Sequence, residues 1–351
     1  MMSHFAVYAF QRGSPGWLLG VVLMVACNGG PADHSDARVT VATHLRQAPD
    51  ESSTTTQHLP EGAALLDLGE VSPYLSGIYL GDTLLWEPWL RMRTLEGNTG
   101  WVFGGFVQLN KASTGETLRW RCEKRLYALF GPIPAQRLMR WAAQPITTDT
   151  ALAHHLREGL ALRDTLQTAL RYGLRRPTPD AQPDLRWLSP YLRYLRRYRG
   201  GIAVDYGLLA REAQQTRGQQ DDYFAQSCIE AYPIDSMESP LPAWVFPLSW
   251  TESASNLGAG RHQATLDRLD DALQQAPLFQ PEWQRLKDLV MSDILDIERS
   301  YWQPLPKILA ELDALLAQPP NCLTAQERAA LALRRQMLAQ GLARTDLRSG
   351  R

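Results

Sequence analysis

The pattern of apolar and polar positions changes near residue 110 and divides the chain into two parts. Before that point, short runs that favour strands are separated by turns containing Gly or Pro, as around residues 63–68, 84–94 and 101–103. Short strands in such close succession favour a small, strongly bent antiparallel barrel. From residue 117 onwards, leucines recur every three or four positions, which predicts helices.

The helical part is expected to occupy residues 117–344. Leucines at helical spacing fall within residues 152–170 and again within 185–195. Further helices are expected at residues 206–216, 221–232, 262–275, 281–300, 305–317 and 324–342. The last of these begins with Thr324 and Glu327, the signature of a capping box. The predicted fold class is therefore multidomain: a small all-β barrel over residues 38–109, followed by a larger all-α domain, with a disordered tail over residues 345–351.

The first 26 residues have the character of an export signal. The apolar run over residues 17–26 is too short to span a bilayer, which takes ~20 apolar residues in a helix. It does fit the ~7–15 residue apolar core of a signal peptide, and Arg12 supplies a positive charge before it. An uncleaved anchor and a plain secretory signal are the alternatives.

The end of this run, Leu23-Met24-Val25-Ala26-Cys27, resembles a bacterial lipobox. In that family the cysteine takes up diacylglycerol and becomes the acylated N-terminus after cleavage. The resemblance implies that residues 1–26 are a lipoprotein signal peptide and that Cys27 is the lipidation site anchoring the protein to a membrane. Residues 27–37 then form a polar tether. Asn28 follows the cysteine instead of Asp, which implies the outer membrane, facing the periplasm.

Four short motifs follow one another within residues 38–109: His44-Leu45-Arg46 with Pro49, Leu59-Pro60-Glu61-Gly62, Gly69-Glu70, and Gly100-Trp101-Val102-Phe103. In this order they resemble a bacterial Src-homology-3-type domain, in which a Leu-Arg start precedes a variable loop and Gly-Trp-Val closes the barrel. Gly100 is expected to supply the turn conformation that lets the last hairpin fold tightly. The stretch at residues 72–82 is longer than a minimal turn, so it either widens a groove or packs onto the helices.

That resemblance implies binding, because bacterial domains of this type are mostly targeting modules for peptidoglycan or other envelope ligands. Aromatic side chains lining a shallow groove suit a glycan or a peptide, so the candidate ligand contacts are Trp86, Trp89, Trp101 and Phe103. The alternative is that Trp101 and Phe103 belong to the barrel core or form a seat for the helical part, since apolar residues at strand spacing are usually buried.

Charge argues against a nucleic-acid partner, because the formal net charge of the chain is -1. One segment, residues 184–201, does interleave arginines with tyrosines. Its leucine stripe predicts an amphipathic helix that presents Arg and Tyr to solvent or to a partner, and contact with anionic lipid headgroups is the alternative.

Candidates for catalysis are few. His262, Asp222 and Asp293 are the titratable residues proposed for acid–base chemistry, and residues 250–262 form a loop whose backbone N–H groups are placed to hold an anion before a helix. Surface positions and helix caps are the alternative reading. No motif for a metal or a cofactor occurs, so neither is expected. Cys122, Cys228 and Cys322 allow at most one disulfide, or are buried small residues.

The sequence therefore favours a non-catalytic lipoprotein of the cell envelope whose barrel binds a peptidoglycan-type ligand or a partner protein. The alternative is an envelope hydrolase whose helical domain carries the chemistry and whose barrel targets it. Convergence of His262 with two of Asp205, Asp222, Asp293 and Glu298 in one pocket would favour the hydrolase. A third alternative is a scaffold in which the barrel packs permanently on the helices.

Overall fold

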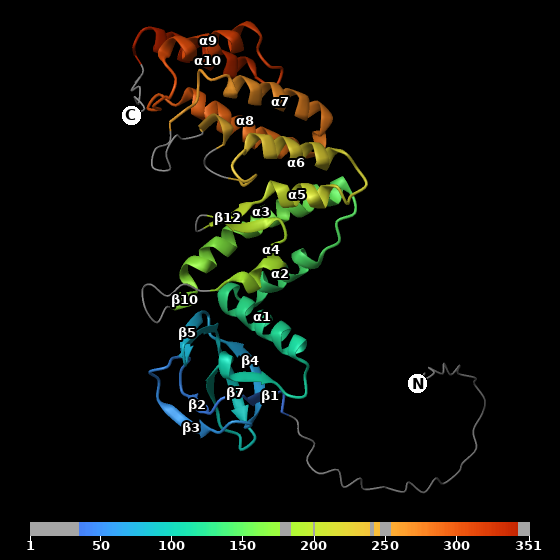
Figure 1. The fold of residues 1–351 in the computed structure, drawn as a ribbon, viewed down its shortest axis with the longest axis vertical. Coiled ribbons are helices and arrows are strands. Elements are labelled where there is room, and N and C mark those ends of the chain that lie inside the picture. Colours follow the sequence, from blue (N-terminus) through green and yellow to red (C-terminus); the bar gives the residue numbers. More distant parts are fainter. Residues whose placement is uncertain (1–34, 176–183, 199–200, 239–241, 246–253, 343–351) are drawn as a thin grey trace, which may run out of the picture.

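A computed structural model describes residues 35–175, 184–198, 201–238, 242–245 and 254–342. An N-terminal, mostly stranded region and a C-terminal helical region are stacked end to end in an elongated molecule (Figure 1). The expected signal peptide, Cys27 and the tail at residues 345–351 lie outside the described residues, as does most of the tether. Within the described ranges, no helix is both long and apolar enough to cross a membrane.

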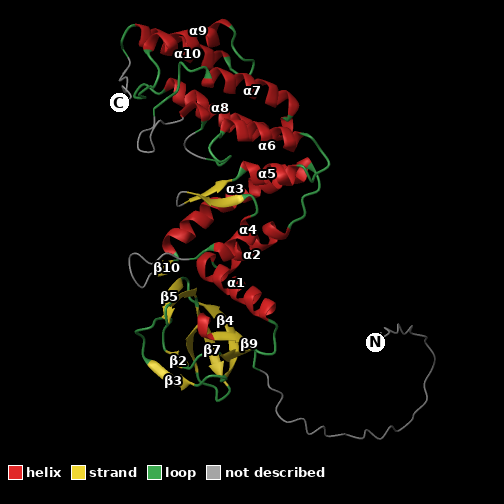
Figure 2. Ribbon diagram, in the orientation of Figure 1, coloured by secondary structure: helices red, strands yellow, loops and turns green. Residues whose placement is uncertain are grey.

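Within the described residues, the main sheet has seven strands, and they are drawn in yellow at one end of the molecule in Figure 2. They are β1 (Ala37–Val39), β2 (Thr43–Arg46), β3 (Thr55–Leu59), β4 (Ala64–Val71), β7 (Trp89–Thr94), β8 (Thr99–Phe103) and β9 (Val107–Leu109). Their order is β3-β2-β8-β7-β4-β1-β9, with antiparallel pairing between neighbours. The sheet is not closed, because its terminal strands β3 and β9 do not pair.

Strand positions follow the sequence pattern closely. The apolar run at residues 84–94 is interrupted at Pro88, which has no N–H to donate, and so becomes two strands, β6 (Thr83–Glu87) and β7. Alternate residues of the main sheet point inward, and their apolar side chains form a compact cluster that includes Leu45, Leu65, Met92 and Val102.

Gly100 has a different role from the one expected. It is not among the glycines with positive φ, and Gly97 takes the left-handed conformation of the turn instead, with φ +93°. A Cβ at Gly100 would lie 2.7 Å from the backbone oxygen of Arg46. The glycine is therefore needed because β2 and β8 approach too closely for a side chain, whereas the turn conformation is supplied three residues earlier.

The stretch at residues 72–82 belongs to a hairpin that joins the two regions. β5 (Leu75–Leu80) pairs with β6 and with β10 (Leu174–Arg175), which follows a helix far along the chain. Leu75 and Trp86 are part of the core of the helical region. Residues on the other side of the hairpin cover the outer face of the main sheet. The hairpin is thus packed on both regions at once.

The first half of the helical region contains α1 (Thr114–Phe130), α2 (Pro132–Ala143), α3 (Asp149–Tyr172), α4 (Ser189–Leu192) and α5 (Tyr206–Ala213). The second half contains α6 (Gln220–Ala231), α7 (Arg261–Gln275), α8 (Gln280–Leu295), α9 (Leu305–Ala317) and α10 (Ala325–Ala339). Thr324 and Glu327 form the predicted capping box at the start of α10. Cys122, Cys228 and Cys322 are free thiols.

This region is not all-α, and the helix expected at residues 184–201 is wrong. The segment forms the single turn α4, then β11 (Leu195–Tyr198), which pairs with β12 (Gly201–Val204). Arg193 interrupts the helical path with φ +50°. Leu188, Leu192 and Leu195 are buried all the same. Their spacing indicated burial correctly, but pairing with β12 is a non-local contact that helical periodicity does not encode.

Charged side chains of α1 fix the sheet against the helices. Lys124 Nζ lies 2.5 Å from Asp67 Oδ2, and Arg125 donates to both carboxylate oxygens of Glu87 at 2.9 and 2.5 Å. Glu87 is 3% exposed, so its charge is removed from water and requires this bidentate partner. The two regions are therefore joined by both apolar and ionic contacts.

A buried histidine in the first half predicts a loss of stability in acid. His155 stacks on Trp141, and its Nδ1 accepts from the Tyr194 hydroxyl while Nε2 donates to the Trp141 carbonyl. Burial lowers the pKa of His155 from 6.5 to about 4. Between these values the unfolded chain binds a proton that the folded chain rejects, so stability falls as the pH falls through this window.

Lowering the pH from 7 to 4.5 should lower the free energy of unfolding of the wild type. The decrease should be about 2 kcal/mol smaller in His155→Gln, because one pKa unit corresponds to ~1.4 kcal/mol. Urea unfolding at the two pH values measures this difference. Parallel pH dependence in the two proteins would show that His155 is not the responsible group.

Candidate functional site

Three of the four candidate aromatic side chains have no face available to a ligand. Trp86, Trp89 and Phe103 are only 6%, 3% and 1% exposed. Trp86 packs into the helical core, whereas Trp89 and Phe103 pack with Tyr74 and Ile78 beneath the β5–β6 hairpin. Residues 72–82 therefore cover the aromatic face instead of widening a groove. These three residues are corrected from ligand contacts to core residues.

Trp101 differs from the others because it is only partly buried. One part of the indole packs against the aromatic cluster under the hairpin, and the rest remains open at the edge of that cluster. Trp101 is the register partner of Arg46 on β2 and of Arg91 on β7, so the three side chains lie on the same outer face of the sheet.

Each of the two arginines is partly engaged. The Arg91 guanidinium lies 5.9 Å from the centre of the Trp101 ring and forms a 3.0 Å ion pair with Glu70. Arg46 donates to the Ser53 carbonyl at 2.7 Å. A guanidinium has five N–H donors, so both retain donors for an incoming anion. We define Trp101, Arg46 and Arg91 as the Trp101 face.

Such a face combines two kinds of recognition. The exposed part of an indole offers an apolar surface for the ring of a sugar or for an aliphatic side chain. Guanidinium groups bind carboxylates through paired, charge-assisted hydrogen bonds. A ligand that carries sugar rings and carboxylates would use both.

His262 and Asp293, two of the catalytic candidates, do meet. His262 Nε2 lies 2.8 Å from Asp293 Oδ2, and the Ser255 hydroxyl donates to the same oxygen at 2.6 Å. Arg299 Nε lies 2.9 Å from Asp293 Oδ1. Asp222 is not part of this cluster: it lies in the first turn of α6, next to the buried Asp221.

The hydrogen bonding of this cluster does not suit catalysis. In a Ser–His–Asp triad, the two ring nitrogens of His contact the carboxylate and the hydroxyl separately. Here the carboxylate and the hydroxyl both approach Nε2, while Nδ1 is buried without a hydrogen-bond partner in the described chain. Ser255, His262 and Asp293 are at most 2% exposed, so a substrate cannot reach them. Their position favours a structural role in joining α7 to α8.

The loop before α7 does hold an anion, and that anion belongs to the chain itself. The Glu311 carboxylate of α9 accepts from the backbone N–H groups of Gly258 and Gly260 at 2.5 and 3.0 Å. Its other oxygen accepts from those of His262 and Gln263, both at 3.1 Å. A helix N-terminus favours exactly such a negative charge. The donors expected to face a ligand are thus used internally.

Asp205 also has structural partners. Asp205 caps α5 by accepting from the Leu208 N–H, and its other oxygen accepts from Arg196. Within the described ranges, no group of three or more His, Cys, Asp or Glu side chains is placed to hold a metal ion.

Comparison with known proteins adds no precedent for this arrangement. No family model, curated protein or solved structure matches the chain.

Sequence reasoning missed the two arginines beside Trp101. Arg46 lay within one of the quoted motifs and Arg91 within a predicted strand, yet neither was singled out. The usable signal was register, since a hairpin between residues 89–94 and 99–103 places Arg91 opposite Trp101. Glu311 gave no comparable signal, because its partners lie about fifty residues earlier in the chain.

Proposed function

We propose that this protein is a non-catalytic, lipid-anchored component of the bacterial cell envelope. In this proposal the stranded region is a Src-homology-3-type module, and it binds a peptidoglycan-type ligand at the Trp101 face. The observation that carries the proposal is the position of Trp101, the only one of the four candidate aromatics that is not buried, opposite Arg46 and Arg91 on the two neighbouring strands.

The chemistry of the ligand matches that of the Trp101 face. Peptidoglycan offers sugar rings, short peptides and carboxylates on one polymer. Stacking on Trp101 supplies apolar contact, and the free donors of Arg46 and Arg91 supply carboxylate recognition.

Anchoring through Cys27 would place the module within reach of its ligand. Residues 27–37 extend at most about 35 Å when fully stretched. The module is joined to the helices through Glu87 and Arg125, among other contacts, so the anchor would position the whole folded chain. The helices would then act as an arm that extends from the bound site.

The hydrolase alternative has weaker support. Of the acidic residues weighed with His262, Asp293 is bonded to it, while Asp205 is bonded to Arg196 and Asp222 is outside the cluster. The meeting point of His262 and Asp293 is sealed from solvent. We therefore favour binding over hydrolysis.

Co-sedimentation with purified peptidoglycan tests this proposal. The chain should be used from residue 28 onwards and not as residues 38–109 alone, because Leu75 and Trp86 belong to the helical core. We expect the wild type to sediment with peptidoglycan, and we expect Trp101→Ala to bind about tenfold more weakly, since stacking of an aromatic ring contributes on the order of 1 kcal/mol or more.

Tyr172→Ala is a matched control, because Tyr172 is an aromatic residue that is 75% exposed on the helical region. It should sediment like the wild type. Arg91→Met tests the same face without truncating an aromatic ring and should also weaken retention. A wild type that stays in the supernatant, or a folded Trp101→Ala that sediments equally well, would overturn the proposal.

A further inference from the structure

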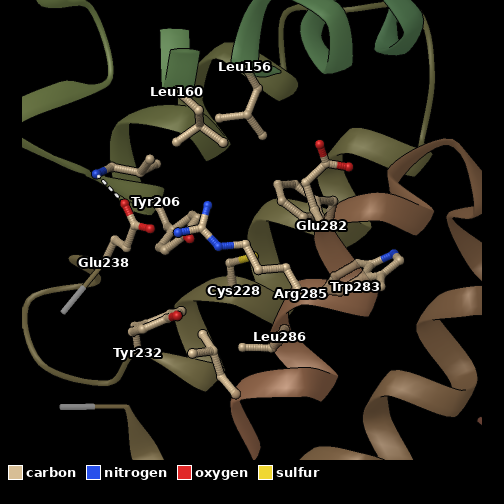
Figure 3. Close-up of a pocket in the computed structure, with 13 residues that line it drawn as sticks. Leu156, Leu160, Tyr206, Cys228, Tyr232, Glu238, Glu282, Trp283, Arg285 and Leu286 are labelled. Atoms are coloured by element: carbon tan, nitrogen blue, oxygen red, sulfur yellow. Dashed lines mark hydrogen bonds between the residues drawn. The ribbon is translucent and has the colours of Figure 1, made fainter. Parts of the chain in front are cut away.

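A pocket remote from the Trp101 face lies at the seam between the two halves of the helical region (Figure 3). Its walls come from α3, β12, α5, α6 and α8, and its volume is about 60 Å³. The lining is mostly apolar and aromatic: Leu156, Leu160, Val204, Tyr206, Phe224, Cys228, Tyr232, Trp283, Leu286 and Leu289, with the charged residues Glu238, Glu282 and Arg285.

Both glutamates in the lining form ion pairs with arginines that are not part of the lining. Glu282 accepts from Arg157 through both carboxylate oxygens, at 2.8 and 2.9 Å. Glu238 accepts from Arg163 at 2.5 Å and from the Val204 N–H at 3.3 Å. Their negative charge is therefore already compensated.

Arg285 has no such counterpart. Its side chain extends from α8 across the pocket towards Tyr206 in Figure 3. Throughout the described ranges, no hydrogen bond or ion pair engages its guanidinium. Arg285 is an exposed residue, so its N–H donors can be reached from solvent and are available to a carboxylate that lies beside the apolar lining.

The lining includes two tyrosines with neutral hydroxyl groups, of which that of Tyr206 already interacts with the Cys228 thiol. Tyr206 and Tyr232 stack with their ring centres 5.3 Å apart. Burial raises the pKa of both phenols, so each keeps its O–H at neutral pH. Burial also raises the pKa of the Cys228 thiol, which stays protonated and is not a nucleophile. These groups favour binding of an anion over covalent chemistry.

We propose that this pocket binds a carboxylate carried on a short aliphatic group, with the carboxylate on Arg285 and the aliphatic part against Tyr206, Leu156 and Leu286. The volume limits the ligand, because a single water needs about 10–15 Å³ and the pocket therefore holds only a few non-hydrogen atoms. A long acyl chain is too large. Two sources share this chemistry: a free short-chain acid, and the C-terminal residue of a peptide with a small apolar side chain.

Ligand-observed NMR on residues 28–351 tests the site, with butyrate, trialanine and their neutral amides as probes. We expect at least one of the two carboxylates to bind and both amides to bind markedly less. Arg285→Met should weaken that binding about tenfold or more, the usual worth of a hydrogen bond to a charged group. Arg140→Met, at an exposed arginine of α2, should bind like the wild type.

The pattern of binding identifies the source of the carboxylate. If butyrate binds and trialanine does not, the ligand is a free short-chain acid. If trialanine binds and butyrate does not, the ligand is the C-terminus of a peptide. If both bind, the site recognises the carboxylate and aliphatic group that the two probes share. The proposal would be overturned if neither carboxylate binds, if the amides bind as well as the carboxylates, or if a folded Arg285→Met binds like the wild type. Trp101→Ala should leave these results unchanged, which separates this site from the proposed function.

Discussion

Replacing Glu311 by Ala is expected to lower the free energy of unfolding by about 4 kcal/mol. Its carboxylate accepts four backbone N–H groups from Gly258, Gly260, His262 and Gln263. Glu311 is 6% exposed, and His262 is fully buried. Without the carboxylate, donors at the start of α7 lose their acceptor, and the favourable charge at the helix N-terminus disappears as well.

Asp313→Ala provides the matched control for this experiment. Asp313 is on the same helix, but its side chain is 53% exposed and pairs with Arg335 at the surface, so its loss should leave the free energy of unfolding nearly unchanged. Urea unfolding of the three proteins measures both effects. If Glu311→Ala proves as stable as Asp313→Ala, then the carboxylate does not hold α7 to α9 as described.

Replacing Cys27 by Ala is expected to move the protein from the membrane fraction to the soluble fraction of the cell. Cys27 is the proposed acylation site, and no helix within the described ranges is suited to span a membrane. One acyl chain holds a protein only marginally, whereas several chains anchor it stably, so loss of all of them should remove the association.

Labelling with radioactive palmitate makes this result specific. The wild type and Cys122→Ala should both incorporate label and remain with membranes, because Cys122 is a free thiol on α1 within the folded chain. Cys27→Ala should incorporate none. An unlabelled wild type, or a Cys27→Ala protein that stays with membranes, would favour an uncleaved anchor at residues 17–26.

Local patterns in the sequence predicted local structure well. α9 spans Leu305–Ala317, the residues expected from its apolar spacing, and the capping box of α10 forms at Thr324 and Glu327. Both depend on residues within a few positions of one another. The helix predicted at residues 184–201 is wrong because its leucines can be buried in β11 as readily as in a helix. Only the pairing of β11 with β12 decides between the two structures.

The candidate sites show the same limit. An anion at the start of α7 was predictable from the loop sequence, but its identity as Glu311 was not, since the contact joins residues about fifty positions apart. Alternation placed Trp101 and Phe103 on one face of the sheet, yet nothing local showed that the β5–β6 hairpin covers that face. Trp101 remains partly open because it lies at the edge of that cover.

The central claim is that the open side of the Trp101 indole contacts the ligand. Fluorine NMR of the chain labelled with 5-fluorotryptophan tests it most directly, with the Trp101 signal assigned by its loss in Trp101→Phe. On titration with soluble peptidoglycan fragments, we predict that the Trp101 signal shifts while those of the buried Trp86 and Trp89 stay in place. A Trp101 signal that does not move at saturating fragment concentrations would contradict the account.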